Sequence, residues 1–313
     1  MAQPVHLSIV VPCFNEEQVL PETARRLDIL LNELSARGDI AESRVLFVDD
    51  GSTDNTWRLI EQFAASDPRF HGIKLSRNCG HQRALLAGLL AAPGDAVVSV
   101  DADLQDDLEA IKDMLVAHAD GAEIVYGVRR QRKTDTWFKR VTAEAFYSML
   151  QSVGVQLIFN HADYRLLGRQ ALEALKRYRE TNLFLRGVIP QLGFTSARVY
   201  YDRRERFAGE SKYPFSKMVA LAIEGITSFS EVPLKLITIL GLLISLVSFG
   251  FAIWALWVRI TNPAAVPGWA SIVIPLYMLG GVQLLCMGVI GQYVVKIYSE
   301  TKSRPRFVIE KEL

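Results

Sequence analysis

Cysteine is scarce in this chain of 313 residues, which contains only Cys13, Cys79 and Cys286. The three lie far apart and none forms a CxxC pair, so neither a disulfide framework nor a structural zinc site is expected. Free thiols in a reducing compartment are the simpler interpretation. The N-terminus also lacks the pattern of an export signal, because the apolar stretch at residues 7–14 is short and NEE follows at residues 15–17.

A large net charge is lacking as well, since Lys and Arg outnumber Asp and Glu by only one. A general basic field for nucleic acid is therefore excluded. Charge is missing altogether from residues 236–258 and 267–295. Each run exceeds the roughly 20 residues needed to cross the hydrocarbon core of a bilayer. The two runs predict a hairpin of transmembrane helices, at about residues 236–258 and 269–295. A core helix of a soluble protein is the alternative, which two adjacent uncharged runs disfavour.

Basic residues flank this hairpin on one side. Lys and Arg are frequent before residue 236 and after residue 295, whereas the connector holds only Arg259. The positive-inside rule then places the large domain and both termini in the cytoplasm, with the spans in the inner membrane. We expect a catalytic domain at residues 1–212, interfacial helices at 213–234, the spans within 235–296 and a basic tail at 297–313. A packing helix of the soluble domain is the alternative for residues 213–234.

The first part of the chain alternates β-branched runs with helical patterns. Strands are predicted at residues 6–13, 44–48, 70–75, 96–100 and 124–128. Helices are predicted at residues 15–34, at 52–65 with Ser52 or Thr53 as the cap, and at 82–91. This alternation predicts an α/β fold with a mainly parallel sheet, in which ligands bind beyond the carboxyl ends of the strands.

Acidic residues follow two of these strands. Asp101 and Asp103 end one strand, and two carboxylates at that spacing can hold Mg²⁺ or Mn²⁺ on a diphosphate, with Gln105 as a further oxygen ligand. Acidic pairs also cap helices, but Asp106, Asp107 and Glu109 are available for that role. Asp49 and Asp50 form the second acidic turn, which alone would be an ordinary strand-to-helix turn.

Three motifs together resemble the family-two inverting glycosyltransferases of the Rossmann-like GT-A fold. They are VPCFNEE at residues 11–17, VDDGSTD at 48–54 and DADLQD at 101–106. DYRLL at residues 163–167, RFAGESKY at 206–213 and EGITSFS at 224–230 are similar to segments of the polyprenyl-phosphate class, above all bactoprenol glucosyltransferases, which are related to dolichol-phosphate mannosyltransferase. The chain departs from this pattern at Tyr164, where Phe is usual, and at His81, where Lys or Gln is expected; a structural role is favoured for His81.

The resemblance implies roles for particular residues. The nucleotide-sugar pocket would be lined by Pro12, Asn15, Glu17, Asp49, Asp50 and Asp101. The metal and diphosphate would be held by Asp101, Asp103 and Gln105, and catalysis would involve Asp101, Asp103 and Asp163. The acceptor and its phosphate would be bound by Arg165, Arg206, Ser211 and Lys212. Apart from the resemblance, Arg129, Lys139 and Arg140 lie between the sheet and the Asp163 motif and could supply further cations for the phosphate. Taken singly, several of these basic residues are typical of solvated surface charge.

The implied reaction is transfer of a sugar from a cytoplasmic nucleotide-sugar to polyprenyl phosphate, giving a lipid-linked donor for cell-envelope glycans. UDP-glucose is favoured as the donor, ahead of a UDP-aminosugar and of GDP-mannose, and the resemblance implies a homo-oligomer, a tetramer. A processive polysaccharide synthase is disfavoured because no QxxRW motif is present. A non-enzymatic scaffold would leave the acidic motifs unexplained.

The expected acceptor weakens the need for a general base. The second pKa of a phosphate monoester is near roughly 6, so this acceptor is largely dianionic at neutral pH. We therefore expect Asp163 to position groups and stabilise charge rather than to remove a proton.

Overall fold

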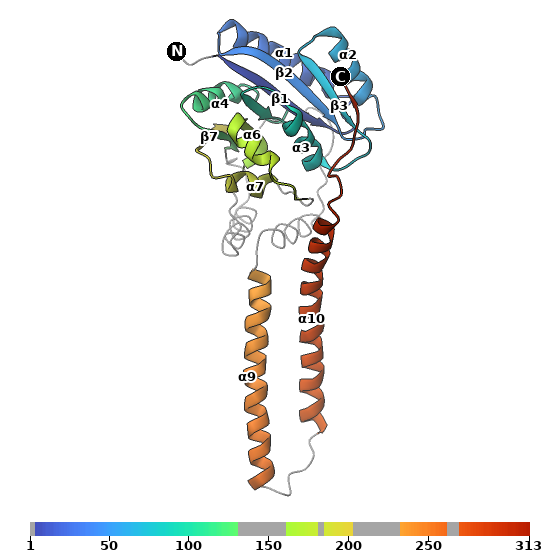
Figure 1. Cartoon of the computed structure of the whole chain (residues 1–313), viewed down its shortest axis with the longest axis vertical. Helices are drawn as coiled ribbons and strands as arrows, with labels where there is room; N and C mark the ends of the chain where they lie inside the picture. Colours follow the sequence, from blue (N-terminus) through green and yellow to red (C-terminus); the bar gives the residue numbers. More distant parts are fainter. Residues whose placement is uncertain (1–3, 131–160, 181–184, 203–231, 262–268) are drawn as a thin grey trace. The chain divides into compact units, whose positions relative to one another are not determined.

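The computed structural model describes residues 4–130, 161–180, 185–202, 232–261 and 269–313 (Figure 1). The chain divides into two compact units. The first comprises Met1–Met149, Gln156–Pro214 and Arg304–Leu313, and the second comprises Leu150–Val155 and Phe215–Ser303. The first unit has the α/β architecture that the sequence predicts.

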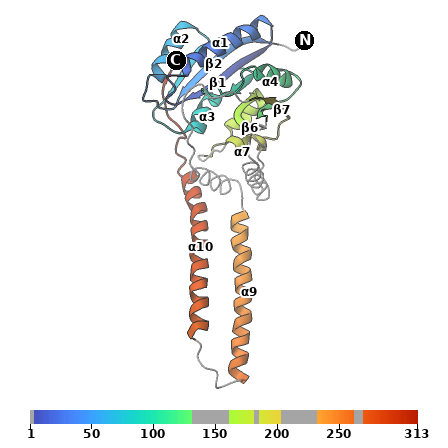
Figure 2. The same ribbon diagram turned by 180° about the vertical axis from the view of Figure 1, so that it is seen from behind.

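The first unit is built on one eight-stranded sheet, in the order β7-β5-β6-β4-β1-β2-β3-β8. Figure 2 shows β1 and β2 of this sheet side by side. The pairs β1–β2, β1–β4, β2–β3 and β5–β7 are parallel, whereas β6 runs antiparallel to β4 and β5, and β8 runs antiparallel to β3. The expectation of a mainly parallel sheet is confirmed. The strands are β1 Val5–Cys13, β2 Ile40–Asp49, β3 Phe70–Leu75, β4 Ala96–Ser99, β5 Ile124–Arg129, β6 His161–Gly168, β7 Ser196–Tyr201 and β8 Ile309–Glu312.

Helices cover both faces of this sheet. Alternate residues of β1 point to opposite faces, so Leu7, Ile9 and Val11 share a buried cluster with apolar residues of α1, α2 and α4. On the opposite face, α3 packs on Val10 and Val48 and lies beside α6. The helices are α1 Leu20–Ala36, α2 Thr56–Ser66, α3 His81–Ala91, α4 Ala110–Ala119, α6 Arg169–Lys176 and α7 Leu185–Gln191.

The start of α2 differs from the prediction. The helix begins at Thr56, and neither Ser52 nor Thr53 caps it. Ser52 Oγ instead accepts a hydrogen bond from the Asn15 amide at 2.9 Å, and the Thr53 amide donates to Asn15 Oδ1 at 2.9 Å. Ser52 and Thr53 thus join the turn after β2 to the loop after β1. At the start of α2, Asp54 Oδ1 accepts a hydrogen bond from the Thr56 amide at 3.0 Å.

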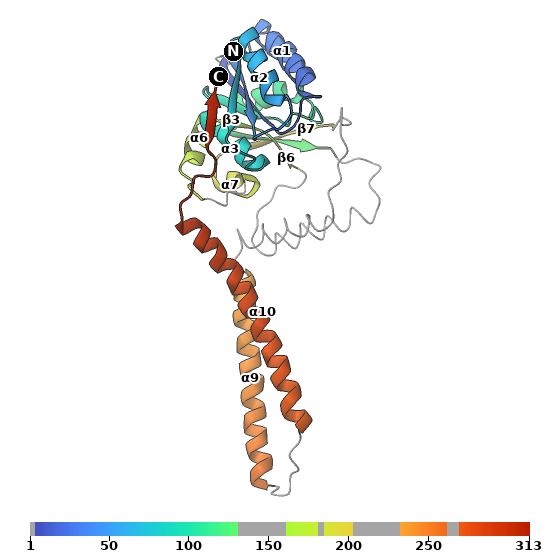
Figure 3. The same cartoon turned by 90° about the vertical axis from the view of Figure 1, so that its right-hand side faces the viewer.

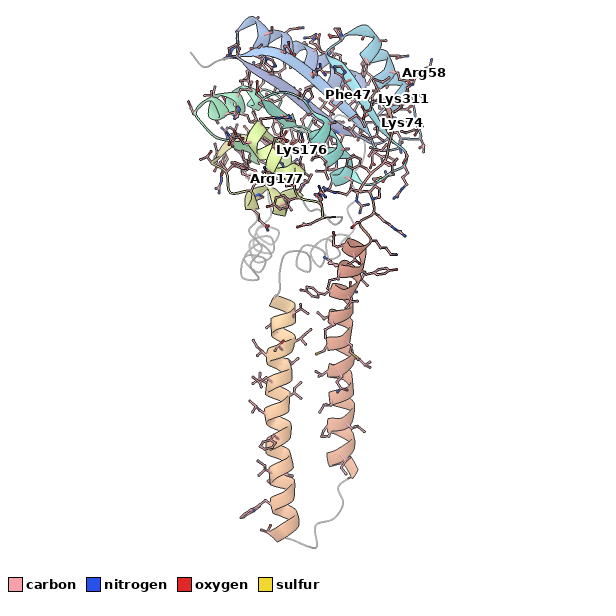
Figure 4. All side chains as sticks on the ribbon, viewed as in Figure 1. Phe47, Arg58, Lys74, Lys176, Arg177 and Lys311 are labelled. Atoms are coloured by element: carbon pink, nitrogen blue, oxygen red, sulfur yellow. The ribbon has the colours of Figure 1, made fainter. Side chains whose placement is uncertain are left out.

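The C-terminal residues supply a strand that the sequence analysis did not predict. β8 pairs with β3 and covers the edge that β3 would otherwise expose (Figure 3). The Leu313 amide donates to the Gly72 carbonyl at 2.9 Å, and the Ser76 amide donates to the Val308 carbonyl at 2.9 Å. Lys74 and Lys311, which face each other in register, are each bound by a glutamate, at 3.0 and 2.7 Å (Figure 4). Segments at the two ends of the chain thus form one sheet.

Two long helices make up the described part of the second unit, α9 Val232–Thr261 and α10 Trp269–Thr301. Large apolar side chains are exposed along both. Among the described residues, Leu279–Thr301 is the one helical segment long and apolar enough to cross a membrane. The first expected span falls within α9, whose side chains are described only in part, so the hairpin remains a prediction. Most of the expected interfacial helix, residues 213–231, lies outside the described residues.

Gly88 sets the distance between α3 and the sheet. A Cβ at this position would lie 2.3 Å from Val10 Cγ1 and 2.8 Å from Val48 Cγ2. We predict that Gly88→Ala lowers the free energy of unfolding by about 1–3 kcal/mol, because overpacking moves α3 off the strands. Thermal unfolding measures this, with Gly288→Ala as the control, since a Cβ there meets nothing within 4 Å. Equal melting temperatures for the two variants would contradict the prediction.

Candidate active site

A cavity of about 330 Å³ opens where several strands end. β1, β2 and β4 contribute their carboxyl ends, which is where a parallel sheet binds ligands. The loop before α3, the start of α3, and residues of β6 and α7 complete the wall. The lining residues are Pro12, Cys13, Phe14, Glu16, Asp50, Asn78, Gly80, His81, Ala84, Asp101, Ala102, Asp103, Asp163 and Arg186.

Asp50 shapes one wall of this cavity. Its carboxylate accepts hydrogen bonds from the Cys79 and Gly80 amides at 2.7 and 2.9 Å. Gly51 allows the close approach, because a Cβ there would lie 2.6 Å from the Asn78 nitrogen. Burial raises the pKa of Asp50, although the two amides act in the opposite direction. Asp50 therefore lines the cavity and also holds the loop that contains Asn78 and Gly80.

Asp49 is placed differently from its neighbour. Its side chain is fully buried and Oδ1 accepts from the Ser52 amide at 3.2 Å. Burial raises its pKa. Asp49 does not line the cavity, so its contacts are those of a residue that fixes the turn after β2.

The loop after β1 is tied to the turn after β2. Asn15, with φ +55°, bonds Ser52 and Thr53, and Glu17 Oε2 accepts from the amide and side chain of Asn55 at 3.0 and 2.9 Å. Pro12 lies at the cavity, but Asn15 and Glu17 are not among its lining residues. These two residues hold the rim together.

The turn after β4 carries the acidic pair. Asp101 and Asp103 both line the cavity. Asp103 Oδ1 accepts from the Gln105 amide at 3.2 Å, and between them Leu104 has φ +59° with a buried side chain. A left-handed conformation costs a residue such as Leu roughly 1–2 kcal/mol. Surrounding contacts must therefore stabilise this turn.

The acidic turn suits a hard cation. Carboxylate oxygens are the ligands of Mg²⁺ and Mn²⁺, and Mg²⁺ sites typically use one or two carboxylates plus substrate phosphates. Among the described residues, no group of three or more His, Cys, Asp or Glu side chains is placed to hold a metal ion. Asp101 and Asp103 would hold a metal together with oxygen atoms of a bound diphosphate. Gln105 is buried beside them.

A second acidic centre lies on β6. Asp163 accepts two hydrogen bonds from Arg186, at 2.9 and 3.2 Å, and it forms an ion pair with Arg165. The Asp163 and Arg165 side chains are 4% and 0% exposed. Burial alone would raise the pKa of Asp163, but His81 and the two guanidinium groups outweigh it and hold this pKa well below its usual range. Asp163 is therefore a permanent anion at neutral pH.

His81 stands between the two acidic centres. Its Nε2 lies 3.5 Å from Asp101 Oδ1 and 3.6 Å from Asp163 Oδ2. Burial would lower its pKa, but the attraction of these carboxylates raises it. The sequence favours a structural role for His81, whereas the structure places it in the cavity wall. Arg186 belongs to no motif and was missed, because only the tertiary fold brings α7 to β6.

The predicted phosphate-binding residues are only partly described. Arg165 is fully buried in its pair with Asp163, and Arg129 binds Asp106 at 3.1 Å and the Tyr201 hydroxyl at 3.1 Å. Asp106 is one of three residues available to cap a helix, but its buried carboxylate faces Arg129, and no side-chain hydrogen bond caps α4. The other predicted residues lie outside the described part, namely Lys139, Arg140, Arg206, Ser211 and Lys212.

Comparison with known proteins shows that the chain is similar to glycosyltransferases. Residues 8–176 match the profile of "Glycosyl transferase family 2". The uncharacterized glycosyltransferase YkoT of Bacillus subtilis (strain 168) is 50% identical, over 100% of this chain and 93% of its own length. The bactoprenol glucosyl transferase of Shigella phage SfX is 40% identical, over 97% and 98%. A mannosyltransferase from Pyrobaculum calidifontis, solved with GDP-mannose and Mn²⁺, is 18% identical over 94% and 85%, with a TM-score of 0.46.

The surroundings of Asp101 disfavour the ionised form of its carboxyl group. Burial, which outweighs the attraction of His81, together with nearby carboxylates raises its pKa from 3.8 to about 6. The protonated form is thus favoured in the folded state, and stability is lost as pH rises through about 6. We predict that Asp101→Asn raises the free energy of unfolding by about 1–3 kcal/mol at pH 7.5 in EDTA, and by little near pH 4. Melting temperatures at both pH values test this. A gain of equal size at both would show that the charge is not the cause.

Proposed function

Because the chain belongs to glycosyl transferase family 2, we propose that it transfers glucose from UDP-glucose to the phosphate of a polyprenyl lipid, with inversion at the anomeric carbon. The observation that carries this proposal is the joint placement of Asp101, Asp103 and Asp163 in one cavity. Support for the acceptor comes from the bactoprenol glucosyl transferase of phage SfX, whose similarity extends over nearly the whole of both chains.

The donor side of the cavity would be formed by the loops after β1 and β2. Pro12 and Asp50 line it, and Asn15, Glu17 and Asp49 hold these loops in place. Asp50 could accept hydrogen bonds from a base or ribose, although two amides already occupy part of its carboxylate. Asp101, Asp103 and Gln105 would hold Mg²⁺ or Mn²⁺, which supplies charge neutralisation for the departing nucleotide when bound.

The acceptor side would be formed around Asp163. Arg186 is 38% exposed and lines the cavity, so its guanidinium group is placed to attract a phosphate. Arg206, Ser211 and Lys212 would add phosphate contacts by the resemblance of their motif. Lys139 and Arg140 would add positive charge. Arg165 and Arg129 are committed to Asp163 and Asp106, so we assign them to organising the site.

Asp163 would act by position and charge. A carboxylate whose pKa lies well below the usual range is a weak proton acceptor. The lipid phosphate needs no such acceptor, because its second pKa is roughly 6 and it is largely dianionic at neutral pH. Asp163 therefore keeps Arg186 and His81 in place, and the rate depends on aligning two anionic substrates between fixed cations.

Membrane attachment would bring the site to its lipid. Leu279–Thr301 is long and apolar enough to span a bilayer, and the exposed apolar side chains of α9 support a second span. With residues 213–234 at the interface, the cytoplasmic domain would meet the lipid phosphate at the level of the headgroups. A homo-oligomer, a tetramer by resemblance, completes the proposal.

The proposal is tested with membranes that contain the protein, undecaprenyl phosphate and Mg²⁺ or Mn²⁺. UDP-glucose, a UDP-aminosugar and GDP-mannose are offered in turn, and the glycosylated lipid is detected by its mass. We expect product from UDP-glucose, with a loss of about 10²-fold or more in Asp103→Ala. Product from another donor would correct the sugar. Absence of product from every donor, in protein that binds nucleotide, would refute the proposed reaction.

Asp163→Asn separates a base from a positioning residue. Removal of the charge leaves Arg165 buried without its partner, so we predict a loss of about 3–5 kcal/mol in stability. The kcat per folded molecule should fall by less than about 10²-fold and show no new pH dependence. The control is Asp113→Asn, an exposed carboxylate on α4. A larger loss of kcat in well-folded protein would contradict the prediction and keep a base role open.

A further inference from the structure

Asp106 is a buried carboxylate that the proposed reaction does not use. It follows the acidic pair by three residues, and its side chain is 0% exposed. The Tyr201 hydroxyl donates to Asp106 Oδ1 at 2.5 Å, and Arg129 Nη2 donates to the same oxygen at 3.1 Å. Arg129 Nε also donates to the Tyr201 hydroxyl at 3.1 Å. The three side chains form a closed triangle of hydrogen bonds.

The sheet holds two corners of this triangle. Arg129 ends β5 and Tyr201 ends β7, and these residues face each other in the parallel register of the two strands. The Arg130 amide donates to the Tyr201 carbonyl at 2.9 Å. The triangle therefore ties the turn after β4 to two strands on the other side of β6.

Tyr164 binds the residue after Asp106 in the same turn, Asp107. Its hydroxyl donates to the Asp107 carbonyl at 2.8 Å, and its ring meets Tyr201 edge to face at 5.2 Å. Gly127 makes room for it, because a Cβ there would lie 2.8 Å from the Tyr164 ring. Tyr164 is also the position where the family motif usually has Phe, so its hydroxyl is a contact that this chain adds.

The opposite end of the turn is anchored as well. Thr23 Oγ1 of α1 donates to the Ala102 carbonyl at 2.8 Å. Between these anchors stand Asp103, the left-handed Leu104 and Gln105. A residue in this conformation persists only where its surroundings determine it. The anchors on both sides supply that constraint.

We propose that Tyr201, Tyr164 and Arg129 are positioning residues that hold the turn at residues 104–107 in the conformation that presents Asp103 and Gln105 to a divalent cation. The proposal rests on the metal site assigned above and concerns the affinity of that site. Without the hydroxyl contacts, Leu104 would leave its left-handed conformation in part of the molecules. Cation binding would then have to restore the turn, and its affinity would fall.

The test compares Tyr201→Phe and Tyr164→Phe in the full-length protein. Binding of Mn²⁺ to the UDP-saturated protein is measured by calorimetry, and binding of UDP alone is measured in EDTA. We expect the dissociation constant of Mn²⁺ to rise by about 3- to 10-fold in each variant, because Tyr164→Phe removes one hydrogen bond and Tyr201→Phe removes two. UDP binding in EDTA should stay at the wild-type value. Backbone amides at residues 104–107 should exchange hydrogen faster.

Tyr200→Phe is the matched control, because Tyr200 precedes Tyr201 on β7 and is 52% exposed. It should bind Mn²⁺ like the wild type. Wild-type Mn²⁺ affinity in both test variants would overturn the proposal. A parallel loss of Mn²⁺ binding, metal-free UDP binding and melting temperature would also overturn it, because that pattern marks general destabilisation. If Tyr201→Phe fails to fold, Tyr164→Phe decides, since Phe is usual in that motif.

Asp103→Ala separates this proposal from the metal site on which it rests. Mn²⁺ binding that survives Asp103→Ala would refute the metal site itself. Mn²⁺ binding that is lost in Asp103→Ala but unaffected in both tyrosine variants would refute only the positioning role.

Discussion

The buried pair of Arg165 and Asp163 is the constraint around which the site is arranged. Both side chains belong to β6 and are buried, at 0% and 4% exposure. Neither charge is stable there alone, because removing one partner of a buried pair costs several kcal/mol. The pair helps to keep Asp163 ionised, while backbone pairing holds β6 between β4 and β5. Arg186 and His81 gather around that fixed anion, which in turn places the second acidic centre beside Asp101.

Two acidic centres at neighbouring strand ends give the cavity its chemical character. Asp101 sits where burial and other carboxylates disfavour its charge, and Asp163 sits where cations favour it. A cation at the first centre and an anionic acceptor near the second would both lower the electrostatic energy of the site. The electrostatic energy of the unliganded site is thus higher than that of the site with both ligands bound. Such unfavourable charge placement is common at binding sites, where the ligand offsets it.

The sheet also joins parts of the chain that lie far apart in sequence. β8, from the last residues, lies along β3 and reaches Ser76, just before the loop that Asp50 holds. On the other side of the sheet, β7 contributes Tyr201 to the turn after β4. The cavity is therefore supported from both edges of the sheet. A backbone ladder carries this support at the β8 edge, and the buried Tyr201 side chain carries it at the β7 edge.

The sequence by itself determined the β1–β5 alternation, the parallel sheet and the acidic residues at strand ends, because local periodicity and turn chemistry specify them. It determined the family through motifs at residues 11–17, 48–54 and 101–106. Tertiary structure alone decided the roles of His81, Arg186 and Tyr201, which meet their partners across more than one element. It also decided that Ser52 binds a neighbouring loop, that Asp106 is buried, and that the tail forms β8. These outcomes depend on long-range contacts, which no local pattern encodes.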